Sequence, residues 1–318
     1  DSAAARWTVT MEDDKGAVTT TTARWLYLGS GYYDYDEPFD AEFAGREDFA
    51  GQIIHPQFWP KDLDYAGKKV VVIGSGATAV TIVPSMTEKG DGKGAAHVTM
   101  LQRTPTWYFI RPAKDAFANT LRKFLPEKLA YKITRFKNVR LQDIAFRRAR
   151  EKPEKVKEFL TKKLKDSLGD RYDAQAFTPP YNPWEQRLCL VPDADFFEAM
   201  KADKASVVTD HIERFDKTGI QLKSGKHLDA DIIITATGLK LAVAGKIPVR
   251  VDGEAVAWNE HYYYKACMFS NVPNFSVVFG YLNASWTLRA DIVSEYVCRV
   301  LNHMQQTGTD VATPVLAD

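Results

Sequence analysis

The 318-residue sequence is poor in the residues that mark several protein classes. Its three cysteines lie far apart, so a reducing, cytoplasmic setting fits better than that of a secreted protein held by disulfide bonds. Its six histidines show no metal-ligand spacing, which argues against a zinc or iron hydrolase, and we expect no metal site. No apolar run is long enough to span a bilayer, and no signal peptide is evident.

The chain also has little net charge, but its charged residues are unevenly distributed along the sequence. Residues 121–171 carry 17 Lys and Arg against 7 Asp and Glu, a net +10, whereas the whole chain has a net +1. Apolar residues recur there at helical spacing, for example Leu121, Phe124, Leu125 and Leu129, which predicts amphipathic helices. No aromatic stacking platform or recognition motif accompanies the charge, so nucleic-acid binding is not expected. Solvated helix faces explain it most simply, although a positive face would also steer an anionic cofactor inward.

The clearest positive signal is a strand, a glycine turn and a helix in succession. The apolar run 70–73 predicts a buried parallel strand, and the turn GSGATA leads into a helix. Gly74 would permit the tight turn, Gly76 the approach of a pyrophosphate, and Ala79 close helix–strand packing. The predicted phosphate-binding residues are Gly74, Ser75, Gly76, Ala77, Thr78 and Ala79, with helix amides that favour an anion. The alternative is an ordinary strand–turn–helix without a ligand.

The next predicted strand indicates which dinucleotide would bind. Residues 96–101 read as that strand, and it ends in Gln102, Arg103 and Thr104. A site specific for NAD usually places an acidic residue here, to accept hydrogen bonds from the ribose 2′-hydroxyl. An arginine suits a 2′-phosphate instead, because its planar guanidinium donates in pairs to phosphate oxygens. We predict NADPH as the cofactor, with a solvated strand-end charge as the alternative for Arg103.

Residues 49–60, FAGQIIHPQFWP, match the FxGxxxHxxxWP fingerprint of Baeyer–Villiger monooxygenases, the class B flavoprotein monooxygenases. The chain resembles this family, whose members use FAD, NADPH and O₂ to insert oxygen beside a carbonyl through a flavin C4a-peroxide. Segments such as GYYDYDE, YNPWEQRLCLVP and NASWTL look closest to its mycobacterial ethionamide-activating branch, which oxidises ketones and thioamide sulfur. The resemblance makes His55 a catalytic candidate. A turn histidine satisfied by backbone groups is the alternative.

The resemblance also implies roles for residues near the cofactors. Arg187 matches a family arginine that reaches the flavin and the nicotinamide, where a permanent cation can hold an oxyanion. From the residues alone, a structural arginine paired with Asp193 or Asp195 is the favoured interpretation of Arg187, and only the resemblance favours the cofactor role. The other cofactor-binding candidates implied are Gln186, Gly29, Ser30, Gly31, Ala236, Thr237, Gly238, Asn283, Ser285 and Trp286.

The implied fold is α/β, with two dinucleotide-binding, Rossmann-like domains of the FAD/NAD(P)-binding type and a helical insertion. Residues 1–65 would be part of the FAD-binding domain plus the linker, 66–112 and 182–236 the NADP-binding domain, 113–181 the insertion, and 237–318 the return to the FAD-binding domain. Residues 5–11 and 17–28 predict a hairpin rather than a flavin GxGxxG unit. We therefore expect an internal portion that lacks the N-terminal FAD half and the C-terminal tail.

The expected activity is oxygenation of a small-molecule ketone or sulfur compound with NADPH and O₂, and the fragment by itself is expected to be inactive. One alternative is a flavin-containing monooxygenase that oxygenates nitrogen and sulfur but not ketones. The other, for the chain as given, is a catalytically silent NADP(H)-binding module.

Overall fold

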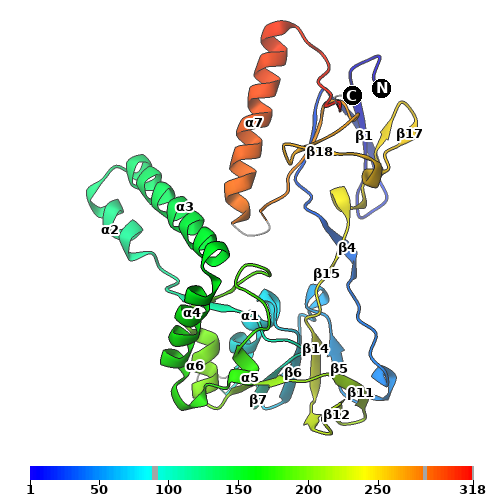
Figure 1. The fold of residues 1–318 in the computed structure, drawn as a ribbon. Helices are drawn as coiled ribbons and strands as arrows, with labels where there is room; N and C mark the ends of the chain where they lie inside the picture. The colour runs from blue at the N-terminus through cyan, green and yellow to red at the C-terminus, as the bar shows by residue number, and fades with distance from the viewer. Residues whose placement is uncertain (88–91, 282–284, 317–318) are drawn as a thin grey trace. The chain divides into compact units, whose positions relative to one another are not determined.

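The computed structural model describes residues 1–87, 92–281 and 285–316. The chain forms two compact units, drawn in Figure 1. The sheet unit comprises residues 38–238, and the terminal unit comprises residues 1–37 and 239–318. Among the described residues, no helix combines the length and the apolar character needed to cross a membrane.

The sheet unit is built on a five-stranded parallel sheet, which confirms the predicted α/β class. Its strands are β5 (Gln52–Ile54), β6 (Lys69–Ile73), β7 (His97–Gln102), β10 (Ala205–Thr209) and β14 (Ile232–Thr235), in the order β10-β7-β6-β14-β5. All neighbouring strands are parallel. The short edge strand β5 lies within the fingerprint segment and was not predicted. The strand order reverses between β6 and β14, which is the switch point where Rossmann folds bind dinucleotides.

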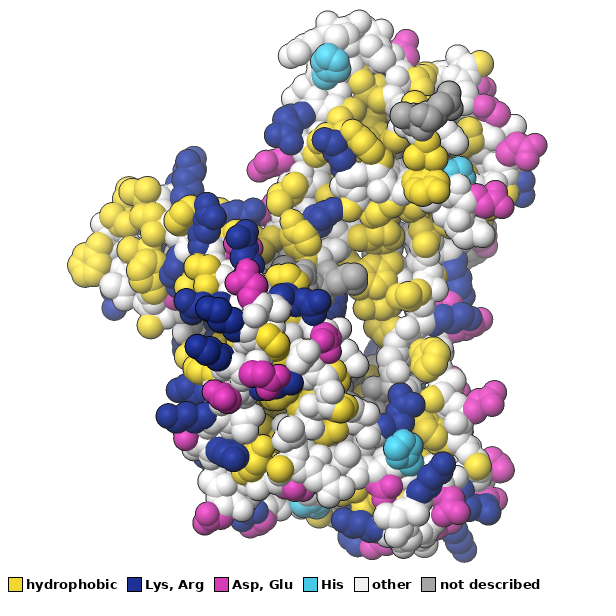
Figure 2. All heavy atoms as spheres, viewed as in Figure 1, with side chains coloured by type: hydrophobic (Ala, Val, Ile, Leu, Met, Phe, Trp, Pro, Cys, Tyr) yellow, Lys and Arg dark blue, Asp and Glu magenta, His cyan; other side chains and the backbone are white. Residues whose placement is uncertain are grey.

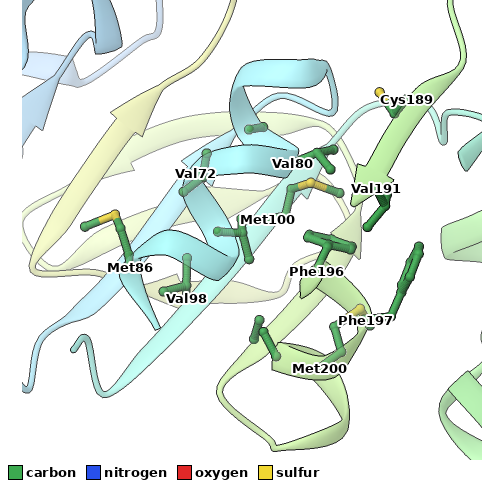
Figure 3. Packing of buried hydrophobic residues seen from close by; sticks show 14 of the residues in the cluster. Val72, Val80, Met86, Val98, Met100, Cys189, Val191, Phe196, Phe197 and Met200 are labelled. Carbon is green, nitrogen blue, oxygen red and sulfur yellow. The ribbon is translucent and has the colours of Figure 1, made fainter. Parts of the chain in front are cut away.

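Alternate residues of the parallel sheet face two separate cores. Val70 and Val72 of β6 pack with α1 (Ala77–Met86) and α6 (Asp195–Lys201) in the core drawn in Figure 3. Val71 and Ile73 pack on the other face, against a second sheet. That sheet is antiparallel and consists of β11 (Ile212–Asp216), β12 (Gly219–Leu222) and β13 (His227–Asp229). The short connections on either side of β12 favour this antiparallel pairing.

A helical segment of the sheet unit begins and ends at two paired strands. Strand β8 (Tyr108–Arg111) pairs in parallel with β9 (Cys189–Pro192), so both ends of the segment lie side by side. Asp115 caps the first helix by accepting a hydrogen bond from the Ala118 amide at 3.1 Å. The helices between the strands are α2 (Ala116–Phe124), α3 (Glu127–Glu151), α4 (Pro153–Leu168), η3 (Gly169–Arg171) and α5 (Ala174–Phe177).

The terminal unit begins with the predicted hairpin, formed by β1 (Trp7–Glu12) and β2 (Val18–Ala23). The prediction of one strand over residues 17–28 was wrong. The chain breaks after β2, and β3 (Leu26–Leu28) pairs in parallel with β20 (Phe275–Val277). The Trp25 indole supports this change of partner by donating to the Ser276 hydroxyl at 2.9 Å. After β20 comes α7 (Trp286–Thr307), whose Val293 and Val297 contact Cys267 and Met268.

The remaining elements are short. The terminal unit also contains β4 (Tyr33–Pro38), β15 (Leu239–Leu241), β16 (Arg250–Val251), β17 (Glu254–Ala255), β18 (Tyr263–Tyr264), β19 (Met268–Phe269), η4 (Val243–Lys246) and η5 (Trp258–Glu260). Two further 3₁₀ turns, η1 (Arg46–Asp48) and η2 (Pro56–Phe58), belong to the sheet unit.

Strands β4 and β15 form a ribbon in which acidic residues of β4 pair with Lys240 and Lys246. Asp34 is 1% exposed, and its carboxylate lies 2.6 Å from the Lys246 ammonium. Glu37 pairs with Lys240 in the same ribbon. The Lys246 hydrogen bond lowers the pKa of Asp34 from its ordinary value; burial opposes this, and the amides of Asp36 and Glu37 reinforce it.

Acidification is expected to destabilise this ribbon through Asp34. Because its pKa is lower in the folded chain than in the unfolded chain, the carboxylate stabilises the fold above a pH of about 4 and loses that effect as the pH falls through the folded pKa. Urea unfolding of wild type and Asp34→Asn at a series of pH values from about 6 to 2 checks this. The wild type should lose more stability than Asp34→Asn, and the exposed control Asp14→Asn should follow the wild type. Parallel curves for wild type and Asp34→Asn would contradict the prediction.

Candidate functional site

The turn after β6 shows why residue 74 is glycine. Gly74 has φ +128°, a conformation that residues with a side chain rarely adopt, and a Cβ there would overlap the carbonyl oxygen of Ala236. Its amide donates to the Leu101 carbonyl at 2.9 Å, which ties the turn to the end of β7. Gly74 is therefore required by the protein's own backbone, as the sequence predicted for the tight turn.

Gly76 lies in a different environment. It precedes α1 with φ −79° and ψ −178°, and a Cβ there would meet no atom within 4 Å. No side chain caps the helix, while Ala77 and Thr78 in its first turn are exposed and Ala79 is fully buried. Uncapped amides, the positive end of a helix dipole and open space above a glycine together fit a pyrophosphate group. The residues present thus fit the dinucleotide that the sequence predicted.

The side chains at the end of β7 and directly after it differ in their exposure to solvent. Arg103 and Thr104 are exposed, and β7 pairs with β6, so Arg103 follows the strand next to the glycine turn. The Ser75 hydroxyl donates to the Thr104 carbonyl at 3.3 Å and joins the two loops. Gln102, in contrast, is 2% exposed, and its amide donates to the Ala176 carbonyl at 2.7 Å and to Thr209 at 2.9 Å. Strand alternation turns the Gln102 side chain inward to these two partners, and its predicted contact with the cofactor stays a prediction.

Arg187 is exposed and lies in the loop before β9. Cys189, two residues later, contacts the glycine turn through its thiol, which lies 3.5 Å from the Ser75 carbonyl oxygen. The preceding turn closes on itself, because the Glu185 carboxylate accepts hydrogen bonds from the Asn182 amide and side chain at 2.9 and 2.8 Å. Gln186 is exposed beside Arg187. This arrangement holds the Arg187 loop next to the predicted phosphate-binding turn.

Cys189 is a residue that sequence reasoning missed. Burial raises the pKa of its thiol, although the nearby Thr106 hydroxyl lowers it, so the sulfur stays protonated and can donate to Ser75. The only available signal was its position two residues after Arg187, which does not reveal which loop it touches. Its role is to bind two loops of the site together.

His55 connects two backbone segments. Its Nδ1 accepts a hydrogen bond from the Gln57 amide at 3.2 Å, so the ring proton lies on Nε2, which donates to the Gly238 carbonyl at 3.1 Å. Thr237 is held in a similar way, because its hydroxyl donates to the Phe39 carbonyl at 3.1 Å. Both ring nitrogens of His55 thus serve the backbone. The alternative interpretation of His55 describes such an arrangement, and a catalytic role for the ring stays a prediction.

Ala236, Thr237 and Gly238 directly follow β14. They lie across the switch point from the glycine turn, because β14 pairs with β6 and Gly74 approaches Ala236. The structure therefore brings residues 74–79, Arg103, Gln186, Arg187 and 236–238 to the carboxyl end of one parallel sheet.

The other candidates lie in the terminal unit. Residues Gly29–Gly31 follow β3, and Ser285 and Trp286 begin α7, which follows β20. Because β3 and β20 are parallel neighbours, these two segments meet: the ring of Tyr32 stacks on Trp286 with centroids 4.9 Å apart. The Ser30 hydroxyl oxygen is buried and has no hydrogen-bond partner among the described residues. Asn283 lies outside the described residues.

Comparison with known proteins shows which family this chain is similar to. A family model described as flavin-binding monooxygenase-like matches residues 1–172. A probable FAD-binding monooxygenase, AlmA, of Acinetobacter baylyi is 48% identical over 314 residues, 99% of this chain and 62% of the relative. The FAD-containing monooxygenase EthA of Mycolicibacterium smegmatis is 50% identical over 310 residues, 97% of this chain and 62% of the relative. The chain thus spans about 62% of the length of these relatives.

Solved structures share the fold at low sequence identity. A steroid monooxygenase bound to NADP aligns with a TM-score of 0.68 and 19% identity over 98% of this chain and 66% of that chain. An open structure of cyclohexanone monooxygenase aligns with a TM-score of 0.69 and 17% identity over 96% of this chain and 67% of that chain. A complex of OTEMO with FAD and NADP gives a TM-score of 0.68 and 20% identity over 96% of this chain and 67% of that chain. With the family-model match over more than half of its length, this chain belongs to the flavin-binding monooxygenase-like family.

Proposed function

We propose that this chain carries the NADPH site and part of the FAD site of a Baeyer–Villiger monooxygenase. The enzyme would use NADPH and O₂ to convert ketones to esters and to oxidise sulfur in thioethers and thioamides. The observation that carries the proposal is the open surface above Gly76, at the switch point of the sheet and next to Arg103. The printed names of the relatives as FAD-binding or FAD-containing monooxygenases support the flavin part.

The NADPH part rests on two groups with separate tasks. The amides at the start of α1 would bind the pyrophosphate, where no side chain competes for them. Arg103 would donate to the 2′-phosphate and so distinguish NADPH from NADH. Ser75 keeps both loops together through its hydrogen bond to the Thr104 carbonyl.

The flavin part involves the terminal unit. The unpartnered Ser30 hydroxyl fits a polar group of a ligand, because a buried hydroxyl without a hydrogen bond is costly. Gly29–Gly31 and Ser285–Trp286 would contact the flavin from the paired ends of β3 and β20. When bound, FAD supplies the reaction with O₂. The chain's own residues hold the cofactors and stabilise charge.

Arg187 is proposed as the residue that stabilises negative charge on the reacting oxygen. A guanidinium keeps its positive charge at any working pH, and its fork of donors can hold an oxyanion and a cofactor oxygen together. Its exposure and its position next to the phosphate-binding turn support this assignment. His55 would act through the backbone, as a positioning residue for Gly238.

Replacing Arg103 by alanine is expected to remove most of the preference for NADPH over NADH. The wild type should bind NADPH at least about tenfold more tightly than NADH, since a charge-assisted phosphate contact contributes on the order of 1–3 kcal/mol. Isothermal titration with both nucleotides measures this. Arg147→Ala, on the exposed side of α3, is the matched control and should behave as wild type. Equal affinities in the unmutated protein would contradict the assignment.

Substrate oxidation by the FAD-loaded whole enzyme that contains this chain tests the activity, because the chain by itself is expected to be inactive. A cyclic ketone, a thioether and a tertiary amine are supplied separately with NADPH, and the products are identified by gas chromatography and mass spectrometry. The proposal expects a lactone from the ketone and a sulfoxide from the thioether. Oxidation of amine and sulfur without any lactone would make the protein a nitrogen- and sulfur-oxygenating enzyme instead. NADPH binding without any oxygenated product would make it a nucleotide-binding module.

A further inference from the structure

The helical hairpin formed by α2 and α3 leaves its apolar side chains on the surface. Helix α3 has 25 residues, yet Ala130 and Ala149 are its only described buried residues. Figure 2 shows hydrophobic side chains gathered over this hairpin with Lys and Arg around them. Phe124 at the end of α2 is 78% exposed, and Phe136 on α3 is 65% exposed. Burial in the core therefore does not explain why these positions are apolar.

The exposed residues are not scattered. Leu129, Ile133 and Phe136 follow one another at helical spacing, so they share one face of α3. The adjoining helix α4 has a similar stripe but buries it in the core of the sheet unit, where Leu160 and Leu164 are each 5% exposed. A continuous apolar face that remains exposed marks an interaction site more often than chance.

The charge of the hairpin indicates what kind of surface it meets. Residues 116–151 contain 10 Lys and Arg against 3 Asp and Glu, a net +7. The cations lie beside the exposed rings: Arg140 is 5.4 Å from the centre of the Phe136 ring, and Lys137 is 4.4 Å from that of Phe117. The partner must therefore offer an apolar environment for the exposed rings and negative charges next to it for the Lys and Arg side chains.

We propose that the α2–α3 hairpin docks this protein on an anionic phospholipid bilayer. Phe124 and Phe136 would enter the boundary between headgroups and acyl chains, and the neighbouring Lys and Arg would bind lipid phosphates. Basic residues close to such a surface strengthen binding to anionic lipids, so this surface combines both driving forces. A second copy of the chain fits less well, because a symmetric contact would place one +7 surface against another.

Vesicle sedimentation tests the proposal with the 318-residue chain. Extruded vesicles of phosphatidylcholine with phosphatidylglycerol are compared with vesicles of phosphatidylcholine alone. The wild type should bind the anionic vesicles at least about tenfold more tightly, and high salt should weaken that binding because it screens the charges. The double variant Phe124→Ser, Phe136→Ser should lose about tenfold in affinity. The control Tyr262→Ser, 67% exposed in the terminal unit, should bind as wild type.

Further measurements separate the possible outcomes. Lys132→Glu with Arg140→Glu tests the charge without changing an aromatic residue, and it should weaken binding to anionic vesicles even if the serine variant were to misfold. NADPH affinity should stay unchanged in all these variants, so a failure here is distinct from a failure of the proposed function. Equal binding to both kinds of vesicle, or wild-type binding by the serine variant with an unchanged melting curve, would overturn the proposal. A wild-type dimer in analytical ultracentrifugation would also overturn the proposal, provided that the dimer does not bind vesicles and that the variant Phe124→Ser, Phe136→Ser is monomeric.

Discussion

Replacing Gly76 by alanine is expected to weaken NADPH binding at least about tenfold while leaving the free energy of unfolding almost unchanged. The backbone at Gly76 has φ −79°, which alanine adopts freely, and the added Cβ meets no protein atom within 4 Å. The change in stability should therefore stay within about 1 kcal/mol, since alanine lowers the entropy of the unfolded chain but is a slightly poorer helix cap than glycine. The methyl group would instead occupy the space that the pyrophosphate needs.

The same substitution at Gly74 should have the opposite profile. Alanine at φ +128° is strained, and its Cβ would overlap the Ala236 carbonyl, so Gly74→Ala should destabilise the fold by about 3 kcal/mol or more. Urea unfolding and isothermal titration with NADPH on both variants form one experiment. The two glycines are two residues apart and serve as each other's control. A loss of stability in Gly76→Ala as large as that in Gly74→Ala would show that the open surface is not a ligand site.

Removing the guanidinium of Arg187 is expected to abolish oxygenated product while NADPH oxidation continues. In the Arg187→Ala variant of the FAD-loaded whole enzyme that contains this chain, the reducing equivalents should appear as hydrogen peroxide, because nothing would stabilise the negative charge on the oxygen atom that is transferred. Loss of one such electrostatic contact typically lowers a rate by about a hundredfold or more. Arg187→Lys should recover only part of the activity, because an ammonium is a point charge without the planar fork.

Three readouts on the same samples test this role. NADPH absorbance, peroxide formation and ester yield are measured together, and Arg147→Ala again serves as the control. If Arg187→Ala converted a ketone at the wild-type rate, Arg187 would have no part in the chemistry. If NADPH oxidation stopped as well, the residue would act in nucleotide binding or folding rather than in oxygen transfer.

The parts of the fold that depend on local pattern were predictable from the sequence. The runs that became β6 and β7 are short, apolar and bounded by turns, and each formed a strand within about two residues of its predicted range. The glycine turn was predictable as well, because a positive φ and a close backbone approach are tasks that glycine alone performs. Both signals depend only on residues that lie close together in the sequence.

The features that the sequence did not reveal have a common physical origin in long-range pairing. Residues 17–28 read as one strand, but the segment after Ala23 found a partner about 250 residues away in β20. Gln102 sits next to Arg103, yet strand alternation turns one side chain inward and leaves the other exposed. The two hydrogen bonds of His55 depend on where Gly238 lies. None of these partners can be read from the residues around the position concerned.

The paired strands β8 and β9 have a consequence for the evolution of the helical segment between them. Tyr108 lies opposite Cys189, so the helical segment begins and ends at the same place in the sheet unit. The entropy of closing a loop rises slowly with its length, by about 0.6 kcal/mol for each doubling, once the two ends are held together. Helices between β8 and β9 can therefore be lengthened, lost or exchanged without altering the register of the five parallel strands. Descendants of one ancestor can remodel this segment while they inherit the nucleotide-binding scaffold intact.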